Sequence, residues 1–226
     1  MSVPISRKET VYGWIYLAIE LFLLPGILLS VNQMLGEPLS EAELNFLYFV
    51  INFLSVVLIF HSFLRRSVER IFENAKEFLK AVLLGFLIYL AYSLVFGLIL
   101  SKFFPDFQNL NDQAVGQMLE SSRLLMVIGT VILVPPVEEC FYRGLLFRNF
   151  YEKNPLLAAI LSSLAFSAIH LISFLGILSP AELAVSLLQY VPAALLLCWS
   201  YRKADTIFAP IVIHSLINLR AICLMR

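Results

Sequence analysis

Long apolar runs separated by short polar segments fill most of this 226-residue chain. A helix that crosses a membrane needs about 20 mostly apolar residues. Seven runs of roughly that length can be delimited, at residues 11–31, 44–64, 79–101, 123–150, 155–174, 181–201 and 206–225. The pattern therefore predicts an all-α, polytopic transmembrane bundle of about seven spans, with no soluble domain between them.

The segment between the second and third runs has a different pattern. Its apolar positions recur at helical spacing, and charged residues occupy the rest of each turn. The apolar positions are Val68, Ile71, Phe72, Ala75, Phe78 and Leu79, and the charged ones are Arg66, Arg70, Glu73 and Lys76. This pattern is typical of a helix that lies in the membrane interface, and we expect one over residues 65–80 on the inner leaflet.

Composition agrees with a membrane protein. Hydrophobic residues make up 60% of the chain and charged residues 14%, whereas soluble domains have about 45–50% and about 25%. The mean hydropathy is +0.87. The formal net charge is zero, so the chain lacks the positive field that attracts nucleic acid. We therefore expect the lipid bilayer as a partner and no nucleic acid.

Lysines and arginines are distributed unevenly between the two sides of the predicted spans. If the N-terminus is inside, four of the 16 lie on the outer side, namely Lys102, Arg123, Arg220 and Arg226, and the others lie on the inner side. Because inner loops are enriched in these residues, we expect a multi-pass protein of the cell membrane with a cytoplasmic N-terminus. The first run exceeds the roughly 7–15 apolar residues of a signal peptide, so we expect it to be retained.

The fourth apolar run carries charged residues at membrane depth, in the sequence Glu138-Glu139-Cys-Phe-Tyr-Arg143. Ionisable groups inside spans are costly and tend to mark function. Residues four apart share a helix face, so Glu139 can pair with Arg143 while Glu138 points in another direction. The unpaired Glu138 is then a candidate general base.

Two prolines, Pro135 and Pro136, directly precede this motif. Proline has no N–H and cannot donate to the carbonyl four residues earlier. In a regular α-helix the carbonyls without a donor would be those of Val131 and Ile132. We expect the helix to open there, and such a gap could admit the water that a hydrolase needs.

Two further motifs lie in the fifth and seventh runs. Phe166 precedes His170 by four residues, and His214 precedes Asn218 by four, so each pair shares one helix face. His214 and Asn218 could therefore converge on one oxygen atom. A rise of about 1.5 Å per residue puts both histidines and Glu138 within the hydrocarbon layer, which permits a common site.

The three motifs, in this order and each in its own apolar run, resemble those of the CPBP family of intramembrane proteases (CAAX protease and bacteriocin-processing, also called the ABI family). The eukaryotic Ras-converting CAAX endopeptidases are distant relatives of that family. The resemblance covers residues 123–225. It divides the chain into residues 1–122, with three spans and the interfacial helix, and residues 123–226, a four-span catalytic core.

The resemblance implies an endopeptidase that hydrolyses a peptide bond of a membrane-associated, lipidated or hydrophobic peptide. It also implies a role for each motif residue. Glu138 and His170 would activate water, His214 and Asn218 would stabilise the oxyanion, and Glu139, Arg143 and Phe166 would support the site.

The same residues leave a metal mechanism open. A carboxylate and two histidines, here Glu138, His170 and His214, are also a set that binds zinc. Asn218 is a poor zinc ligand but a suitable oxyanion donor, and this favours a mechanism without a metal. We therefore expect no cofactor, with Zn²⁺ as the alternative.

Two other functions remain open. A transporter or channel also places glutamate and histidine inside spans, but it predicts broken helices in two repeated halves, and here the motifs lie in the second half only. A catalytically silent regulator of another membrane protein would tolerate an altered catalytic position, and none of the motif positions is altered. Glu20, in the first run, has no assigned role.

Overall fold

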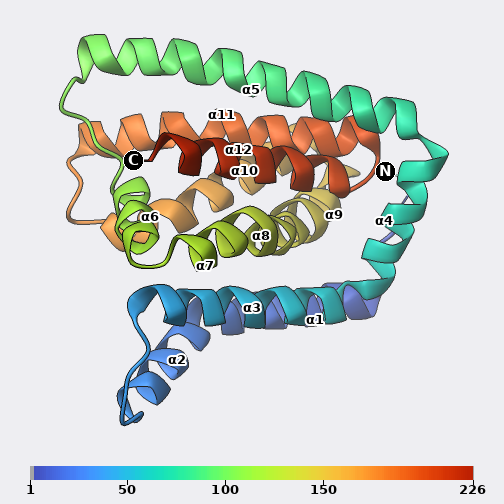
Figure 1. Cartoon of the computed structure of the whole chain (residues 1–226). Helices are drawn as coiled ribbons and strands as arrows, with labels where there is room; N and C mark the ends of the chain where they lie inside the picture. The colour runs from blue at the N-terminus through green and yellow to red at the C-terminus, as the bar shows by residue number, and fades with distance from the viewer. Residues whose placement is uncertain (1–2, 226) are drawn as a thin grey trace.

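The computed structural model describes residues 3–225, and in that part of the chain every regular element is a helix (Figure 1). In chain order they are α1 (Arg7–Phe22), α2 (Leu24–Gln33), α3 (Glu41–Ile59), α4 (His61–Glu73), α5 (Ala75–Phe103), α6 (Leu110–Ser121), α7 (Arg123–Val127), η1 (Ile128–Leu133), α8 (Val134–Glu139), η2 (Cys140–Phe147), α9 (Arg148–Tyr151), α10 (Pro155–Leu171), η3 (Ile172–Phe174), α11 (Pro180–Ala204) and α12 (Phe208–Leu224). The predicted all-α, polytopic bundle is confirmed.

The number of spans differs from the seven that the apolar runs predict. Among the described residues, 5 helices are long and apolar enough to cross a membrane, and the count is 6 if the bent pair α1 and α2 forms one span. The expected seventh span is α12, which has only 17 residues. At about 1.5 Å per residue it is roughly 25 Å long, less than the roughly 30 Å of the hydrocarbon core.

The first apolar run is a bent pair of helices and not one straight span. The axes of α1 and α2 meet at 45°. Pro25 lies in the first turn of α2, just after the break at Leu23. Proline removes a backbone hydrogen bond and clashes with the preceding turn, so a continuous helix is interrupted at this point.

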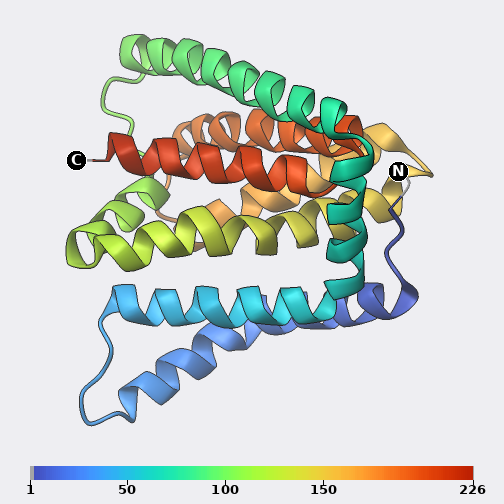
Figure 2. The same ribbon diagram turned by 45° about the vertical axis from the view of Figure 1, so that its right-hand side comes forward.

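The predicted interfacial helix is present but has different boundaries. It is α4, which covers residues 61–73, whereas we expected 65–80. Phe60 and Asn74 have non-helical backbone angles and end it on both sides, and residues 75–80 are already the first turns of α5. The second span therefore ends at Ile59 and not at residue 64. Figure 2 shows α4 crossing one end of the bundle between α3 and α5.

The helix that carries Glu138 lies in the middle of the bundle. The segments from α7 to α9 form one continuous helix of 29 residues. On one side α3 packs against η1 and α8, and on the other α12 packs against the same two segments. The contact with α3 is close, because a Cβ atom added at Gly129 would lie 2.5 Å from Cδ2 of Phe49. This packing fixes the position of the central helix between the N-terminal and C-terminal halves.

Candidate active site

The central helix departs from α geometry on both sides of the two glutamates. Its segments η1 and η2 are π-helical, and α8 lies between them. In η1 the bonds run to the carbonyl five residues earlier, as from Val134 N–H to Gly129. The next residue, Pro135, has no N–H to donate, so the carbonyl of Thr130 loses its helical donor. Asn218 supplies the missing donor, with its Nδ2 2.8 Å from the Thr130 oxygen.

This arrangement corrects the predicted opening of the helix. We expected the carbonyls of Val131 and Ile132 to lose their donors, which holds only for a regular α-helix. The π register moves the first such carbonyl to Thr130, and a side chain from α12 satisfies it. Because Pro135 leaves the Thr130 carbonyl without a helical donor, Asn218 can bond to it and so joins α12 to the central helix.

The pair predicted within the first motif is present and completely buried. Nη1 of Arg143 donates to Oε1 of Glu139 at 2.9 Å, and both side chains are 0% exposed. The guanidinium also donates to the main-chain carbonyl of Ala194 at 3.1 Å and lies 4.6 Å from the centre of the Phe166 ring. These contacts connect the central helix to α10 and α11. Removing one partner of a buried charge such as Arg143 leaves that charge uncompensated and strongly destabilises the folded protein.

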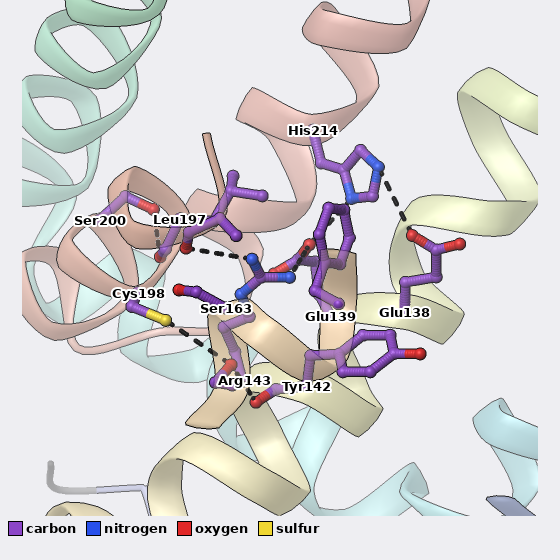
Figure 3. Close-up of polar contacts among 12 residues, drawn as sticks. Glu138, Glu139, Tyr142, Arg143, Ser163, Leu197, Cys198, Ser200 and His214 are labelled. Carbon is purple, nitrogen blue, oxygen red and sulfur yellow. Dashed lines mark hydrogen bonds and ion pairs between the residues drawn. The ribbon is translucent and has the colours of Figure 1, made fainter. Parts of the chain in front are cut away.

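His214 connects the two glutamates of the motif (Figure 3). Its Nδ1 is 2.8 Å from Oε1 of Glu139, so Nδ1–H donates to that carboxylate. Its Nε2 is 3.7 Å from Oε2 of Glu138, an ion-pair distance that exceeds a normal hydrogen bond. The His214 ring is buried, and its edge faces Phe166. The contacts with Glu139 and Phe166 therefore fix the orientation of the His214 ring next to Glu138.

A cavity of about 280 Å³ lies next to Glu138. Its wall includes three of the predicted catalytic residues, Glu138, His170 and Asn218, which come from three different helices. The Glu138 side chain is 21% exposed, whereas its Oε2 atom, which faces His214, is itself buried and has no hydrogen-bond partner. The carboxylate is therefore available to a molecule in the cavity through its exposed part.

His170 is held by its neighbours in an orientation suited to accept a proton. Its Nδ1 is 2.8 Å from the main-chain oxygen of Phe166, so Nδ1 carries the hydrogen and donates. The ring lies between the rings of Phe166 and Tyr190, with centroids 4.7 Å away on each side. In this tautomer Nε2 has a lone pair, which can accept a hydrogen bond from water or substrate.

The structure thus separates the predicted site residues into two groups. Glu138, His170 and Asn218 line the cavity. The other four, His214, Glu139, Arg143 and Phe166, contact one another and lie outside the cavity wall. We expected His214 to face an oxyanion beside Asn218, and the structure instead places it between two carboxylates.

The opposite wall of the cavity consists of residues that the motifs do not include. They come from α1, α3 and α6 and are Glu20, Tyr48, Phe49, Asn52, Asn111, Asp112 and Val115. Glu20 was the one sequence signal for this wall, because it is an acidic residue in an apolar run. The other residues could not be recognised without the helix packing.

The geometry does not fit a zinc site formed by Glu138, His170 and His214. Among residues 3–225, no group of three or more His, Cys, Asp and Glu side chains could hold a metal ion. The Nδ1 atoms of both histidines are bonded to Phe166 and Glu139, respectively. Whether the reaction uses a metal stays a prediction to be tested.

Comparisons with known proteins gave one match. The family model described as "Type II CAAX prenyl endopeptidase Rce1-like" matches residues 120–220. These residues include the whole central helix, α10, α11 and α12 as far as Arg220, and therefore all three motifs. No curated protein and no solved structure matches the chain.

Proposed function

We propose that this chain, whose residues 120–220 match a family model of CAAX-type endopeptidases, is an intramembrane protease of the CAAX/CPBP family, and we propose a mechanism for its reaction. In general terms the family is one of CAAX-type endopeptidases. The observation that carries the proposal is that Glu138, His170 and Asn218 line one cavity, although they lie on three different helices. They are a carboxylate, an imidazole with a free lone pair and an amide donor, which can activate a water molecule and stabilise the oxyanion in the hydrolysis of an amide.

In the proposed first step, Glu138 and His170 activate a water molecule. The water donates one hydrogen bond to the exposed part of the Glu138 carboxylate and the other to Nε2 of His170. The Glu138 carboxylate takes a proton while the water oxygen attacks the carbonyl carbon of the substrate. The fixed ring of His170 orients the water for this attack, since its contacts with Phe166 and Tyr190 prevent rotation.

The tetrahedral oxyanion is stabilised by the side-chain amide of Asn218. One hydrogen of Nδ2 is bonded to the carbonyl of Thr130, so the amide is held in place and its second hydrogen can donate to the oxyanion. A donor that is fixed before the reaction is effective because it needs no reorganisation. The carbon–nitrogen bond then breaks, and the protonated Glu138 returns its proton to the leaving amine.

His214 is proposed as a positioning residue for Glu138. Its contact with Glu139 fixes the ring, and its other nitrogen approaches the Glu138 carboxylate. Glu139 and Arg143 hold His214 in turn and do not reach the substrate. The substrate is a hydrophobic or lipidated peptide that enters from the bilayer, because the cavity lies among the membrane helices.

The test is hydrolysis by the purified protein in liposomes. A set of hydrophobic peptides with a fluorophore and a quencher is incubated with the wild-type protein, with Glu138→Gln and with Glu120→Gln, in water enriched in ¹⁸O. We expect cleavage by the wild type and by Glu120→Gln, no cleavage by Glu138→Gln, and one ¹⁸O atom in each new carboxyl end. If the folded wild type cleaves no peptide, the proposal is wrong and a silent regulator is favoured.

A further inference from the structure

The cavity contains two carboxylates that the proposed reaction does not use. Glu20, on α1, accepts a hydrogen bond from the hydroxyl of Tyr48 at 3.0 Å. Asp112, on α6, accepts one from Nε2 of Gln189 at 3.3 Å. Both residues line the same cavity as Glu138. Three carboxylates therefore surround one small space, and the donors to two of them are neutral groups.

The helix α6 is fixed so that Asp112 stays at the cavity. Asn109, directly before α6, donates from Nδ2 to Oε1 of Gln189 and to the hydroxyl of Tyr190, in each case at 3.0 Å. These bonds and the bond from Gln189 to Asp112 connect α6 to α11. Tyr190 is also the residue that packs on His170. The position of Asp112 is thus coupled to the catalytic wall.

The negative charge of the cavity has no matching cation in the described part of the chain. No lysine or arginine among residues 3–225 lines the cavity, and Arg143 is bound to Glu139 outside it. Burial raises the pKa of Asp112, although the hydrogen bond from Gln189 opposes this. Carboxylates in such surroundings favour a bound cation.

An independent observation points to a bound peptide. Asn52, on α3, lines the cavity and is only 2% exposed. Its Oδ1 accepts a bond from the hydroxyl of Tyr16 at 2.8 Å, but its Nδ2 has no hydrogen-bond partner. A buried donor without a partner is costly, and a main-chain carbonyl of a peptide would satisfy it.

We infer that the cavity selects peptides with a lysine or arginine side chain beside the scissile bond. Glu20 and Asp112 hold the positive charge, and Asn52 donates to a main-chain carbonyl of the same peptide. This inference rests on the proposed function for the cleavage step, whereas binding of the basic side chain can be measured separately. The rest of the peptide is apolar, in keeping with the apolar residues of the wall such as Phe49 and Ile169.

The experiment compares two hydrophobic peptides that differ only at the central residue, which is lysine in one and norleucine in the other. Binding is measured by fluorescence anisotropy in detergent micelles on the His170→Ala protein, which keeps all three carboxylates. Near a partly buried carboxylate, we expect the lysine peptide to bind about tenfold more tightly. Adding Glu20→Gln and Asp112→Asn should bring the two affinities together. Glu120→Gln is the control, because Glu120 is on α6 but outside the cavity.

Equal binding of the two peptides to the His170→Ala protein would overturn the inference, as would a lysine preference that survives the double substitution. If the double variant fails to fold, each single substitution should reduce the preference. Cleavage by the wild type is measured with the same peptides. Cleavage of both at equal kcat/KM would overturn the inference and leave the proposed function intact. A lysine preference in binding without any cleavage would instead overturn the proposed function alone.

Discussion

The side-chain amide of Asn218 donates a 2.8 Å hydrogen bond to the main-chain carbonyl of Thr130. This bond joins α12 to the π-helical segment η1, just before the two glutamates. The sequence explains this bond, because Pro135 has no N–H to donate to the Thr130 carbonyl and the side chain of Asn218 supplies the donor instead. The residue proposed to stabilise the oxyanion is thus held by the helix that carries the proposed base.

Replacing Asn218 with alanine removes the proposed oxyanion donor. Loss of one such donor lowers turnover by about 10² to 10³-fold. Because the interaction forms only in the transition state, kcat and kcat/KM should fall by the same factor. The variant also leaves the carbonyl of Thr130 unpaired, which costs about 1–3 kcal/mol of stability. Steady-state kinetics and thermal unfolding measure the two effects separately, and an unchanged kcat in a folded variant would rule out this role for Asn218.

The two adjacent glutamates should respond differently to the same substitution. Glu138→Gln removes the proposed base from a partly exposed position, so hydrolysis should be lost while the thermal midpoint stays close to that of the wild type. Glu139→Gln leaves Arg143 buried without its carboxylate and weakens the hold on His214. Removing one partner of a buried pair costs about 3–5 kcal/mol, so this variant should unfold at a clearly lower temperature.

The assignment depends on both results together. If Glu138→Gln retained normal turnover, the base would have to be another group. If Glu139→Gln unfolded at the wild-type temperature, the buried pair with Arg143 would not support the site. Lys102→Gln, at the exposed end of α5, is a suitable control for a charge change outside the site.

Part of this site could be predicted from spacing along the chain. The Glu139–Arg143 pair follows from four residues on one helix face, and the three motifs give the residues of one cavity wall. The hydrogen bond to the Thr130 carbonyl could not be predicted, because its donor lies 88 positions away along the chain. Asn52 and Asp112 belong to the site only through the packing of α3 and α6. The bend after Leu23 was foreseeable from Pro25, whereas no proline or glycine marks the end of α4 at Asn74.

Removal of metal ions should leave the proposed reaction unaffected. The residues Glu138, His170 and His214 do not form a metal-binding group, whereas a catalytic zinc needs about three protein ligands and one open position. We expect full activity after exhaustive treatment with a chelator and less than one metal ion per protein by elemental analysis. Loss of activity on chelation, with recovery on addition of Zn²⁺, would show that the proposed metal-free reaction is wrong.

The pH dependence of stability should contain a contribution from Asp112. Burial raises the pKa of its carboxyl above the ordinary value of 3.8 in the folded protein. The folded state therefore binds this proton more tightly than the unfolded state. The resulting stabilisation is complete below the unfolded pKa and is lost as the pH rises through the raised pKa. Asp112→Asn cannot ionise, so it should be more stable than the wild type at neutral pH.

The measurement is the thermal midpoint of both proteins at about pH 4 and about pH 7.5 in one detergent. The difference between variant and wild type should be larger at the higher pH. This comparison cancels the contributions of the other acidic groups, which both proteins share. An equal difference at the two pH values would mean that Asp112 keeps its ordinary pKa. Glu120→Gln, an exposed residue of the same helix, should show no such dependence.

The orientation of the chain in the membrane can be tested at three positions. The turn after α2 and the turn after α5 lie at one end of the bundle, and α4 lies at the other (Figure 1). Because the excess of lysine and arginine predicts a cytoplasmic N-terminus, reporters fused after Val31 and after Leu100 should be outside, and one at Arg66 should be inside. Paired fusions of alkaline phosphatase and green fluorescent protein measure this directly. The opposite result at any two positions would show that the predicted orientation is wrong. The end of the bundle that contains α6 and Asp112 would then face the cytoplasm.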